Sequence, residues 1–182
     1  MTLTSLLPTL RHSIPSPFTR DLWPVGAVPT LDDVVVAGVS VLRYVELCGT
    51  PSVMTGAAVI PLSGGMPSTS ESATVLAVSV VDVIATDAAN ARLVGPEPVI
   101  VVDAVLATAQ PRWGEARLIG RVSDARDRRH LVRDAAGSAV PGVALVLPAD
   151  LIPGDLIAVP CVGAVSVGDV RVRNAEIQAE VA

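Results

Sequence analysis

The sequence predicts a mainly β fold, a single β-barrel domain with one or two short helices. Valine dominates the apolar residues, and its short runs are separated by clusters of Gly, Pro, Asp and Asn, which is typical of strands joined by turns. Hydrophobic residues make up 51% of the 182 residues, enough for the core of one domain. Helical spacing of apolar residues is rare, so strands are favoured over helices along most of the chain.

The valine-rich runs predict a series of strands. They are Asp33–Ala37, Ser52–Met54, Ala73–Ile84, Val99–Leu106, Ala116–Val122, His130–Arg133, Val143–Leu147, Leu156–Val162, Val170–Arg173 and Glu176–Val181. A short helix is expected over Val41–Cys48, where apolar residues recur at helical spacing and Gly49 follows as a cap. A second short helix is expected within Leu3–His12.

Two segments stand apart from the strand pattern. Residues 1–32 contain five prolines and are expected to form an extended arm that crosses the domain surface or reaches a partner. Residues 55–72 are rich in Gly, Ser, Thr and Pro, and are expected to form a flexible loop or linker. The β-barrel domain is therefore predicted to span residues 33–182, with this loop inside it.

The composition excludes several classes of function. All 13 basic residues are arginine, so no lysine is present to form a Schiff base with pyridoxal phosphate or to complete a Walker-type phosphate loop. The net charge is −5 and only 2% of the residues are aromatic. Nucleic-acid binding needs a basic surface or stacking rings, so this composition disfavours it, and with it an oligonucleotide-binding barrel.

The sequence also predicts the cellular location of the protein and the state of its cysteines. No apolar run reaches the roughly 18 to 20 residues of a membrane-spanning helix, and the N-terminus lacks a charged segment followed by an apolar one, so neither a membrane nor export is expected. Cys48 and Cys161 lie far apart and are expected to be reduced. No His, Cys or acidic residues have metal-ligand spacing, so no metal site is expected. The expected location is the cytoplasm.

Both ends of the predicted barrel domain resemble a known enzyme family. Val34–Val39, the expected helix and then Cys48–Val53 (CGTPSV) resemble the opening of the fold-type III pyridoxal phosphate decarboxylases, the family of the diaminopimelate and ornithine decarboxylases. Leu151–Ala164, with its Pro-Gly-Asp turn and final Gly-Ala, is similar to the family's closing segment. Further segments that resemble the family in the same order are Val99–Ala104, Gly120–Asp127 and Arg171–Val181.

The resemblance implies a stand-alone C-terminal β-barrel domain. In the family, the Gly-Thr-Pro strand leads into a (β/α)8 barrel that holds the cofactor lysine, the phosphate site and the histidine that stacks on the cofactor. Here residues 55–72 stand in its place, and the chain has no lysine. The chain is therefore expected to be a pseudoenzyme that binds no pyridoxal phosphate and needs no other cofactor.

The resemblance also points to candidate site residues between Gly120 and Asp127. The family has a cysteine, an acidic residue, two further residues and an aspartate here, and this loop crosses a dimer interface into the neighbour's active site. Ser123 takes the place of the cysteine, Asp124 of the first acid and Asp127 of the second. The alternative is that both acids are ordinary turn residues that neighbouring arginines neutralise. Val165 replaces the family's tyrosine after Gly-Ala, so a hydroxyl is lost.

Three further features have both a functional and a structural interpretation. His130 lies near Asp127 and Asp134 in the sequence and is a candidate general base, or else a solvated histidine at a strand start. Trp113 either lies exposed at the barrel mouth or at an interface, where it anchors a contact, or plugs the barrel end. A cluster of arginines either binds a carboxylate or phosphate, or forms a solvated face that balances local charge: Arg117, Arg121, Arg126, Arg128, Arg129 and Arg133.

The sequence leaves two function classes open. The first is an interaction module, a decarboxylase-like barrel that forms a homodimer or pairs with a lysine-bearing decarboxylase-type subunit, with Trp113 and the arginines around Arg126 at the contact. The alternative is a cofactor-free enzyme of secondary metabolism that holds a small, largely apolar molecule in the barrel. The apolar composition favours a protein that is not a monomer.

Overall fold

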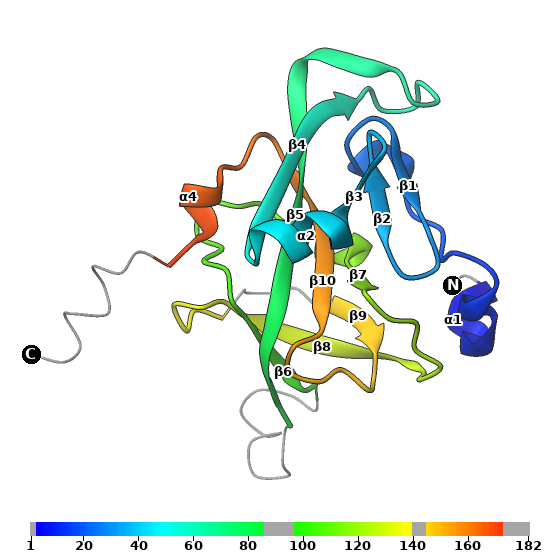
Figure 1. The fold of residues 1–182 in the computed structure, drawn as a ribbon, viewed down its shortest axis with the longest axis vertical. Helices are drawn as coiled ribbons and strands as arrows, with labels where there is room; N and C mark the ends of the chain where they lie inside the picture. Colours follow the sequence, from blue (N-terminus) through cyan, green and yellow to red (C-terminus); the bar gives the residue numbers. More distant parts are fainter. Residues whose placement is uncertain (1–2, 86–96, 140–144, 173–182) are drawn as a thin grey trace, which may run out of the picture.

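The computed structural model describes residues 3–85, 97–139 and 145–172 of the chain (Figure 1). The long strand β5 (Pro67–Ile84) organises the main sheet. Its first part pairs with β4 (Ser52–Val59), and its middle, residues 73–79, pairs with β10 (Leu156–Val162) on the other side. Its last residues pair with β6 (Val99–Val102). The register of β5 against β6 shifts between Val80 and Asp82. Because such an irregularity bends a strand, β5 contributes to two parts of one curved sheet.

The main sheet curls into a nearly closed barrel. Its strand order is β7-β10-β5-β6-β8-β9, where β7 is Arg117–Ile119, β8 is Asp127–Arg133 and β9 is Leu145–Pro148. Neighbours in this order are antiparallel except for β6 and β8, which are parallel. The two outer strands, β7 and β9, approach each other, so the sheet nearly closes on itself. A mainly β, barrel-like fold is thus confirmed.

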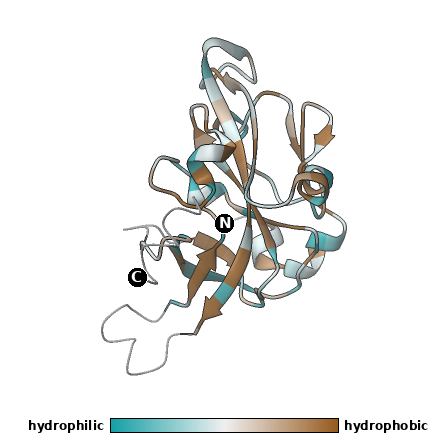
Figure 2. Cartoon of the chain, turned by 60° about the vertical axis from the view of Figure 1, so that its left-hand side comes forward, coloured by the Kyte–Doolittle hydropathy of each residue, from teal (hydrophilic) through white to brown (hydrophobic). Residues whose placement is uncertain are grey.

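Apolar side chains fill the barrel and a second core outside it. The interior cluster includes Leu76 and Val78 of β5, together with residues of β6, β8, β9 and β10. On the opposite face of β5, Val75 and Ala77 pack in the second cluster with Trp23. Because β5 is buried on both faces in its middle, its sequence there is a continuous apolar run rather than an alternating one. Figure 2 shows the barrel strands as mostly hydrophobic.

The second core is covered by a small sheet and one helix. The sheet contains β1 (Ala27–Pro29), β2 (Val34–Val36) and β3 (Val39–Ser40), all antiparallel. Because β1 pairs with β2, the predicted boundary at residue 32 lies inside this sheet. The part of the arm nearest to the barrel domain is therefore built into the fold rather than laid over it.

The helix α2 (Val41–Cys48) has the predicted bounds, and its ends show why. The Ser40 hydroxyl accepts a hydrogen bond from the Arg43 backbone N–H at 2.9 Å and donates one to Asp33 at 2.5 Å. At the other end, Gly49 has φ +73°, a conformation that favours glycine. Both signals are local in the sequence, so the helix could be predicted from it.

We expect Ser40→Ala to lower the free energy of unfolding by about 1 kcal/mol, because the first turn of α2 loses its side-chain cap and Asp33 loses a donor. Urea unfolding followed by circular dichroism measures the change. An unchanged midpoint would show that the cap contributes nothing to stability.

The segment 55–72 differs from its prediction. Most of it belongs to β4 and to the first part of β5, which pair with each other from Ser52 and Ala77 to Val59 and Pro67. Only residues 60–66 form the turn. The polar and small residues lie on a hairpin that projects from the body of the molecule (Figure 1), so their composition reflects exposure and not a lack of regular structure.

The other predicted elements agree with the structure to different degrees. The predicted helix within Leu3–His12 is divided by Pro8 into α1 (Leu3–Leu6) and the 3-10 helix η1 (Pro8–His12). The strand predicted at Val170–Arg173 is wrong over its described residues, because α4 (Val167–Val170) ends at Val170 and residues 171–172 form no strand. A capping box of Ser166 and Asp169 starts this helix. The predicted strand Glu176–Val181 lies outside the described residues. Two further 3-10 turns, η2 (Arg20–Leu22) and η3 (Trp113–Glu115), were not predicted.

Candidate functional site

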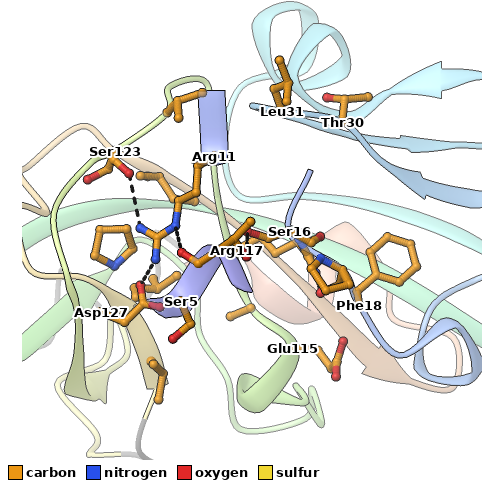
Figure 3. A pocket seen from close by; sticks show the side chains of 18 of the residues that line it. Ser5, Arg11, Ser16, Phe18, Thr30, Leu31, Glu115, Arg117, Ser123 and Asp127 are labelled. Carbon is orange, nitrogen blue, oxygen red and sulfur yellow. Dashed lines mark hydrogen bonds and ion pairs between the residues drawn. The ribbon is translucent and has the colours of Figure 1, made fainter. Parts of the chain in front are cut away.

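A cleft of about 760 Å³ lies between the N-terminal arm and the side of the barrel where β7 and β9 meet (Figure 3). The arm contributes residues from Thr4 to Thr19, and the barrel contributes β7, the segment that follows it and β9. Two of the four predicted candidates, Ser123 and Asp127, line the cleft, whereas Asp124 and His130 do not. A concave site of this size, lined by both polar and apolar side chains, is a candidate binding site.

Arg117, on β7, fastens the arm to one end of the cleft. Its two terminal nitrogens donate to the backbone carbonyls of Ser16 and Pro17, and its guanidinium lies 5.1 Å from the ring centroid of Phe18. Burial lowers the pKa of Arg117 to about 10, although the charge of Glu115 acts in the opposite direction. The guanidinium therefore stays charged at neutral pH, and its terminal donors are already engaged by the arm.

Glu115 makes the matching contacts as an acceptor. Its carboxylate accepts hydrogen bonds from the Thr19 backbone N–H at 2.9 Å, from the Thr19 hydroxyl at 2.7 Å and from the Trp23 indole N–H at 3.3 Å. Trp23 in turn stacks on Phe18, with ring centroids 4.9 Å apart. A charged pair on the barrel thus binds residues 16–23 of the arm through both polar and aromatic contacts.

Ser123 is held by structural hydrogen bonds. Its hydroxyl donates to Asp150 at 2.7 Å and accepts from the Ala125 backbone N–H at 3.0 Å. Burial alone would raise the pKa of Asp150, but the hydrogen bonds from Ser123 and Arg121 outweigh it and lower that pKa. A carboxylate with a lowered pKa is a weak base, so this pair does not activate the serine as a nucleophile.

The two loop acids each face a residue of the arm. Asp124 lies 3.0 Å from Nε2 of His12, and both side chains are exposed. Asp127 accepts a hydrogen bond from Arg11 at 2.6 Å, and both of these side chains are largely buried. Asp127 is paired with an arginine, as the structural alternative expected, but it begins β8 rather than lying in a turn. The arginine comes from the arm and not from the neighbouring cluster.

His130 lies inside the barrel. The residue is 1% exposed, and its Nδ1 has no hydrogen-bond partner among the described residues. The Asp134 carboxylate, a predicted partner, instead accepts backbone N–H groups of Leu106, Ala136 and Ser138. The structure joins His130 to neither acid by a hydrogen bond, and the histidine is buried where a solvated one was the alternative.

The arginine cluster does not converge on one site. Arg121 donates to both oxygens of Asp155 at 2.7 and 2.8 Å and to Asp150 at 3.1 Å, and the hydrogen bonds to Asp155 are the main reason that its pKa is raised. The other members sit on the exposed side of the barrel: Arg126, Arg128, Arg129 and Arg133. Apart from Arg117, which binds the arm, the arrangement matches the charge-balancing interpretation.

Trp113 is 2% exposed and belongs to the barrel core. This burial agrees with the prediction that Trp113 closes the end of the barrel, and not with the alternative of an exposed position. The expectation that Trp113 anchors a contact with another subunit is therefore wrong, because it offers no exposed surface.

Cys48 is exposed and Cys161 is buried, and both are free thiols. Burial raises the pKa of the Cys161 thiol to about 12, so it is not a reactive thiolate. Within residues 3–85, 97–139 and 145–172, no three His, Cys, Asp or Glu side chains are grouped as a metal site would need. In the same ranges no helix is both long and apolar enough to cross a membrane.

A second, smaller hollow of about 240 Å³ lies beside the tip of the β4–β5 hairpin. Its walls come from the tip, from β1 and from the end of β4: Arg20, Gly26, Ala27, Val28, Val59, Gly64 and Gly65. The sequence analysis assigned no role to the residues of this hollow.

It also assigned no role to Arg11, Glu115, Asp150 or Asp155, which make the contacts around the 760 Å³ cleft. Of these four residues, only Asp155 lies in a motif that the sequence analysis noted, the Pro-Gly-Asp turn of the family resemblance.

Comparison with known proteins gives a distant likeness. No protein-family model and no curated protein matches the chain. Two solved structures of the arginine decarboxylase of Paramecium bursaria Chlorella virus, one of them bound to agmatine, align with a TM-score of 0.35 and 16% identity. The alignment covers 54% of this chain, and the chain spans only 28% of the viral enzyme. This is a weak similarity to part of a decarboxylase, and it does not assign the chain to a family.

Proposed function

We propose that the chain is a dimerising interaction module, a decarboxylase-like β-barrel without pyridoxal phosphate chemistry, whose contact is made by the tip of the β4–β5 hairpin. The candidate catalytic groups support a role other than catalysis. Ser123 and Asp127 are engaged in internal hydrogen bonds, and His130 is enclosed in the core. The barrel interior, where the alternative function would place a small apolar ligand, is filled with side chains.

The hairpin tip, residues 60–66, is apolar and exposed. It contains no charged residue, and Ile60, Leu62 and Met66 are exposed. Leu62 is 97% exposed and has φ +62°, a conformation that a leucine rarely adopts. The Leu62 backbone N–H donates to Asp21 at 2.9 Å, which helps to hold this turn. An apolar side chain held outward at the end of a projecting hairpin is suited to insertion into a partner.

The observation that carries the proposal is that this tip and the second hollow lie next to each other. Gly64 and Gly65 belong to the tip and also line the hollow. In a twofold dimer the same surface serves both subunits, so a projection beside a hollow can be self-complementary. We therefore propose that Leu62 of each copy enters the hollow of the other.

The resemblance to the decarboxylases suggests that the hairpin tip could also contact a different subunit. In that family, the strand equivalent to β4 continues into the (β/α)8 barrel, so the hairpin tip marks the side on which that domain lies. A decarboxylase-type subunit without its own β-barrel would meet the chain here. A partner subunit of a pyridoxal phosphate enzyme is thus the heteromeric form of the same proposal.

Sedimentation equilibrium tests the dimer. We expect the wild-type chain to be dimeric at micromolar concentration, and Leu62→Asn to raise the dimer dissociation constant about tenfold or more, because one apolar contact per subunit is lost. Asparagine tolerates positive φ, so this variant keeps the turn. Leu47→Glu is the matched control, because Leu47 is 71% exposed on α2 and away from the tip. A monomeric wild type, or an equal effect of both substitutions, would refute the proposal.

A further inference from the structure

Arg11 of η1 is bound much as a ligand is bound. Its guanidinium donates to the backbone carbonyl of Ser123 at 3.3 Å, to that of Ala125 at 3.1 Å and to the Asp127 carboxylate at 2.6 Å, and its Nε donates to the Thr4 carbonyl at 3.1 Å. The side chain of Arg11 is 11% exposed and that of Asp127 is 20% exposed. Figure 3 shows Arg11 reaching between Ser123 and Asp127.

The backbone of residues 123–127 is held by contacts within the barrel, and Asp127 itself pairs with Pro148 of β9. The Ser123 hydroxyl is fixed to Asp150 and to the Ala125 backbone N–H, and Asp150 is in turn paired with Arg121. Farther along, the Ala149 backbone N–H donates to the Arg126 carbonyl at 2.9 Å. The loop between β7 and β8 is thus shaped by contacts within the barrel, and it presents two carbonyls and one carboxylate to the same point.

This acceptor set suits a guanidinium better than an ammonium. A guanidinium is planar and carries five donors in a fixed fork, so one group can serve two carbonyls and a carboxylate that lie in different directions. An ammonium has three donors on one atom and is more strongly hydrated. The chemistry of residues 123–127 therefore selects an alkylguanidinium.

The start of the arm buries little apolar surface against the barrel. Thr4 is the only buried residue of α1, and Leu3, Leu6 and Leu7 are exposed. His12 of the same segment lies 3.0 Å from Asp124, with both side chains exposed, and the Ser16 hydroxyl donates to the Thr4 hydroxyl at 3.1 Å. Farther along the arm, Arg117 binds the carbonyls of Ser16 and Pro17. Arg11 is thus a largely buried polar attachment of residues 3–15 to the barrel, and these residues form part of one wall of the 760 Å³ cleft.

We propose that residues 123–127 form a guanidinium-binding site that the chain's own Arg11 fills, and that the N-terminal arm is a latch which an alkylguanidinium ligand displaces by competing for the same acceptors. Displacement frees residues 3–15 and opens the cleft on that side. Because the site is distinct from the hairpin tip, the latch does not depend on how the chain associates.

Hydrogen exchange and NMR titration with methylguanidinium chloride test this proposal. We expect Arg11→Ala to raise the exchange rates of the η1 amides about tenfold or more, with the β5 and β10 amides unchanged. In that variant, methylguanidinium at millimolar concentration should shift the backbone amides of residues 123–127 and saturate. The wild type should need a higher concentration, because its own Arg11 competes intramolecularly, and its η1 amides should then lose protection.

Four controls make the test specific. Sodium chloride at the same ionic strength separates site binding from screening. Arg43→Ala removes an exposed arginine that is paired with Glu46 on its own helix and should change nothing. Arg11→Ala combined with Asp127→Asn should no longer bind methylguanidinium, and Arg11→Lys, which keeps the charge and is the milder substitution, should give intermediate exchange of η1. The proposal is overturned if η1 protection does not depend on Arg11, or if methylguanidinium shifts the loop amides equally with and without the Asp127 carboxylate.

Discussion

Replacing Trp113 with alanine is expected to lower the free energy of unfolding by about 3–5 kcal/mol, the usual cost of truncating a large buried side chain. Trp113 lies in η3, which contacts both β9 and β10, and its ring belongs to the barrel core. Truncation removes apolar contacts on both strands and leaves a cavity at the end of the barrel. Equilibrium urea unfolding measures this change.

Trp113→Phe separates packing from hydrogen bonding. The indole N–H of Trp113 is buried and has no partner among the described residues, so phenylalanine removes a polar group that gains nothing from its position. We expect this variant to lose less than about half of the stability that Trp113→Ala loses. Leu62→Ala is the matched surface control and should change stability by less than about 0.5 kcal/mol. If Trp113→Ala weakened association while leaving stability intact, the side chain would belong to an interface after all.

The elements that could be predicted from the sequence are those whose signals are local. The strand β10 has the predicted bounds, Leu156–Val162, because turn residues flank an apolar run on both sides. The helix α2 likewise has a serine cap before it and a glycine after it. In contrast, β1 is only three residues long and is a strand because it pairs with β2, a contact that its own sequence does not specify.

In the hairpin of β4 and β5, strands were instead predicted to be a loop. Its residues 55–72 are small and polar, so their composition resembles a loop, yet each strand supplies the hydrogen-bond partners of the other. Backbone pairing decides the structure here, and it leaves little trace in side-chain hydrophobicity when the strands are exposed on a projecting hairpin.

The cleft could be predicted only in part. Ser123 and Asp127 were found through a resemblance in the spacing of one loop, and both lie where the barrel meets the arm. Arg11, which binds that loop, is more than a hundred residues away in the sequence, and no local pattern marks it as a partner of Asp127. The fold brings Arg11 and Asp127 together, and a contact between residues so far apart cannot be predicted from a single sequence.

Lowering the pH from about 7.5 to about 5 is expected to destabilise the protein through His130. Burial lowers the pKa of His130, and the charge of Arg128 acts in the same direction, although the backbone of Arg128 and of Leu145 favours the protonated form. In the unfolded chain a histidine titrates near its ordinary pKa of about 6.5. Below that pH the unfolded chain binds a proton that the native chain does not, so protonation favours unfolding.

The size and the pH range of the His130 effect follow from this difference in proton binding. Stability is unaffected by His130 above about pH 6.5, and then falls by up to about 1.4 kcal/mol per pH unit until the pH reaches the lowered native pKa. Asp150, whose pKa is also lowered, affects stability in a separate pH range, because its contribution to stability is lost only as the pH falls below the ordinary carboxyl pKa of about 4.

Urea unfolding between about pH 7.5 and about pH 5 therefore isolates the effect of His130. His130→Leu fills a similar volume without a titratable group and should remove the slope, whereas His12→Gln, at an exposed position, should retain it. A slope that survives in His130→Leu would mean that another group takes up the proton.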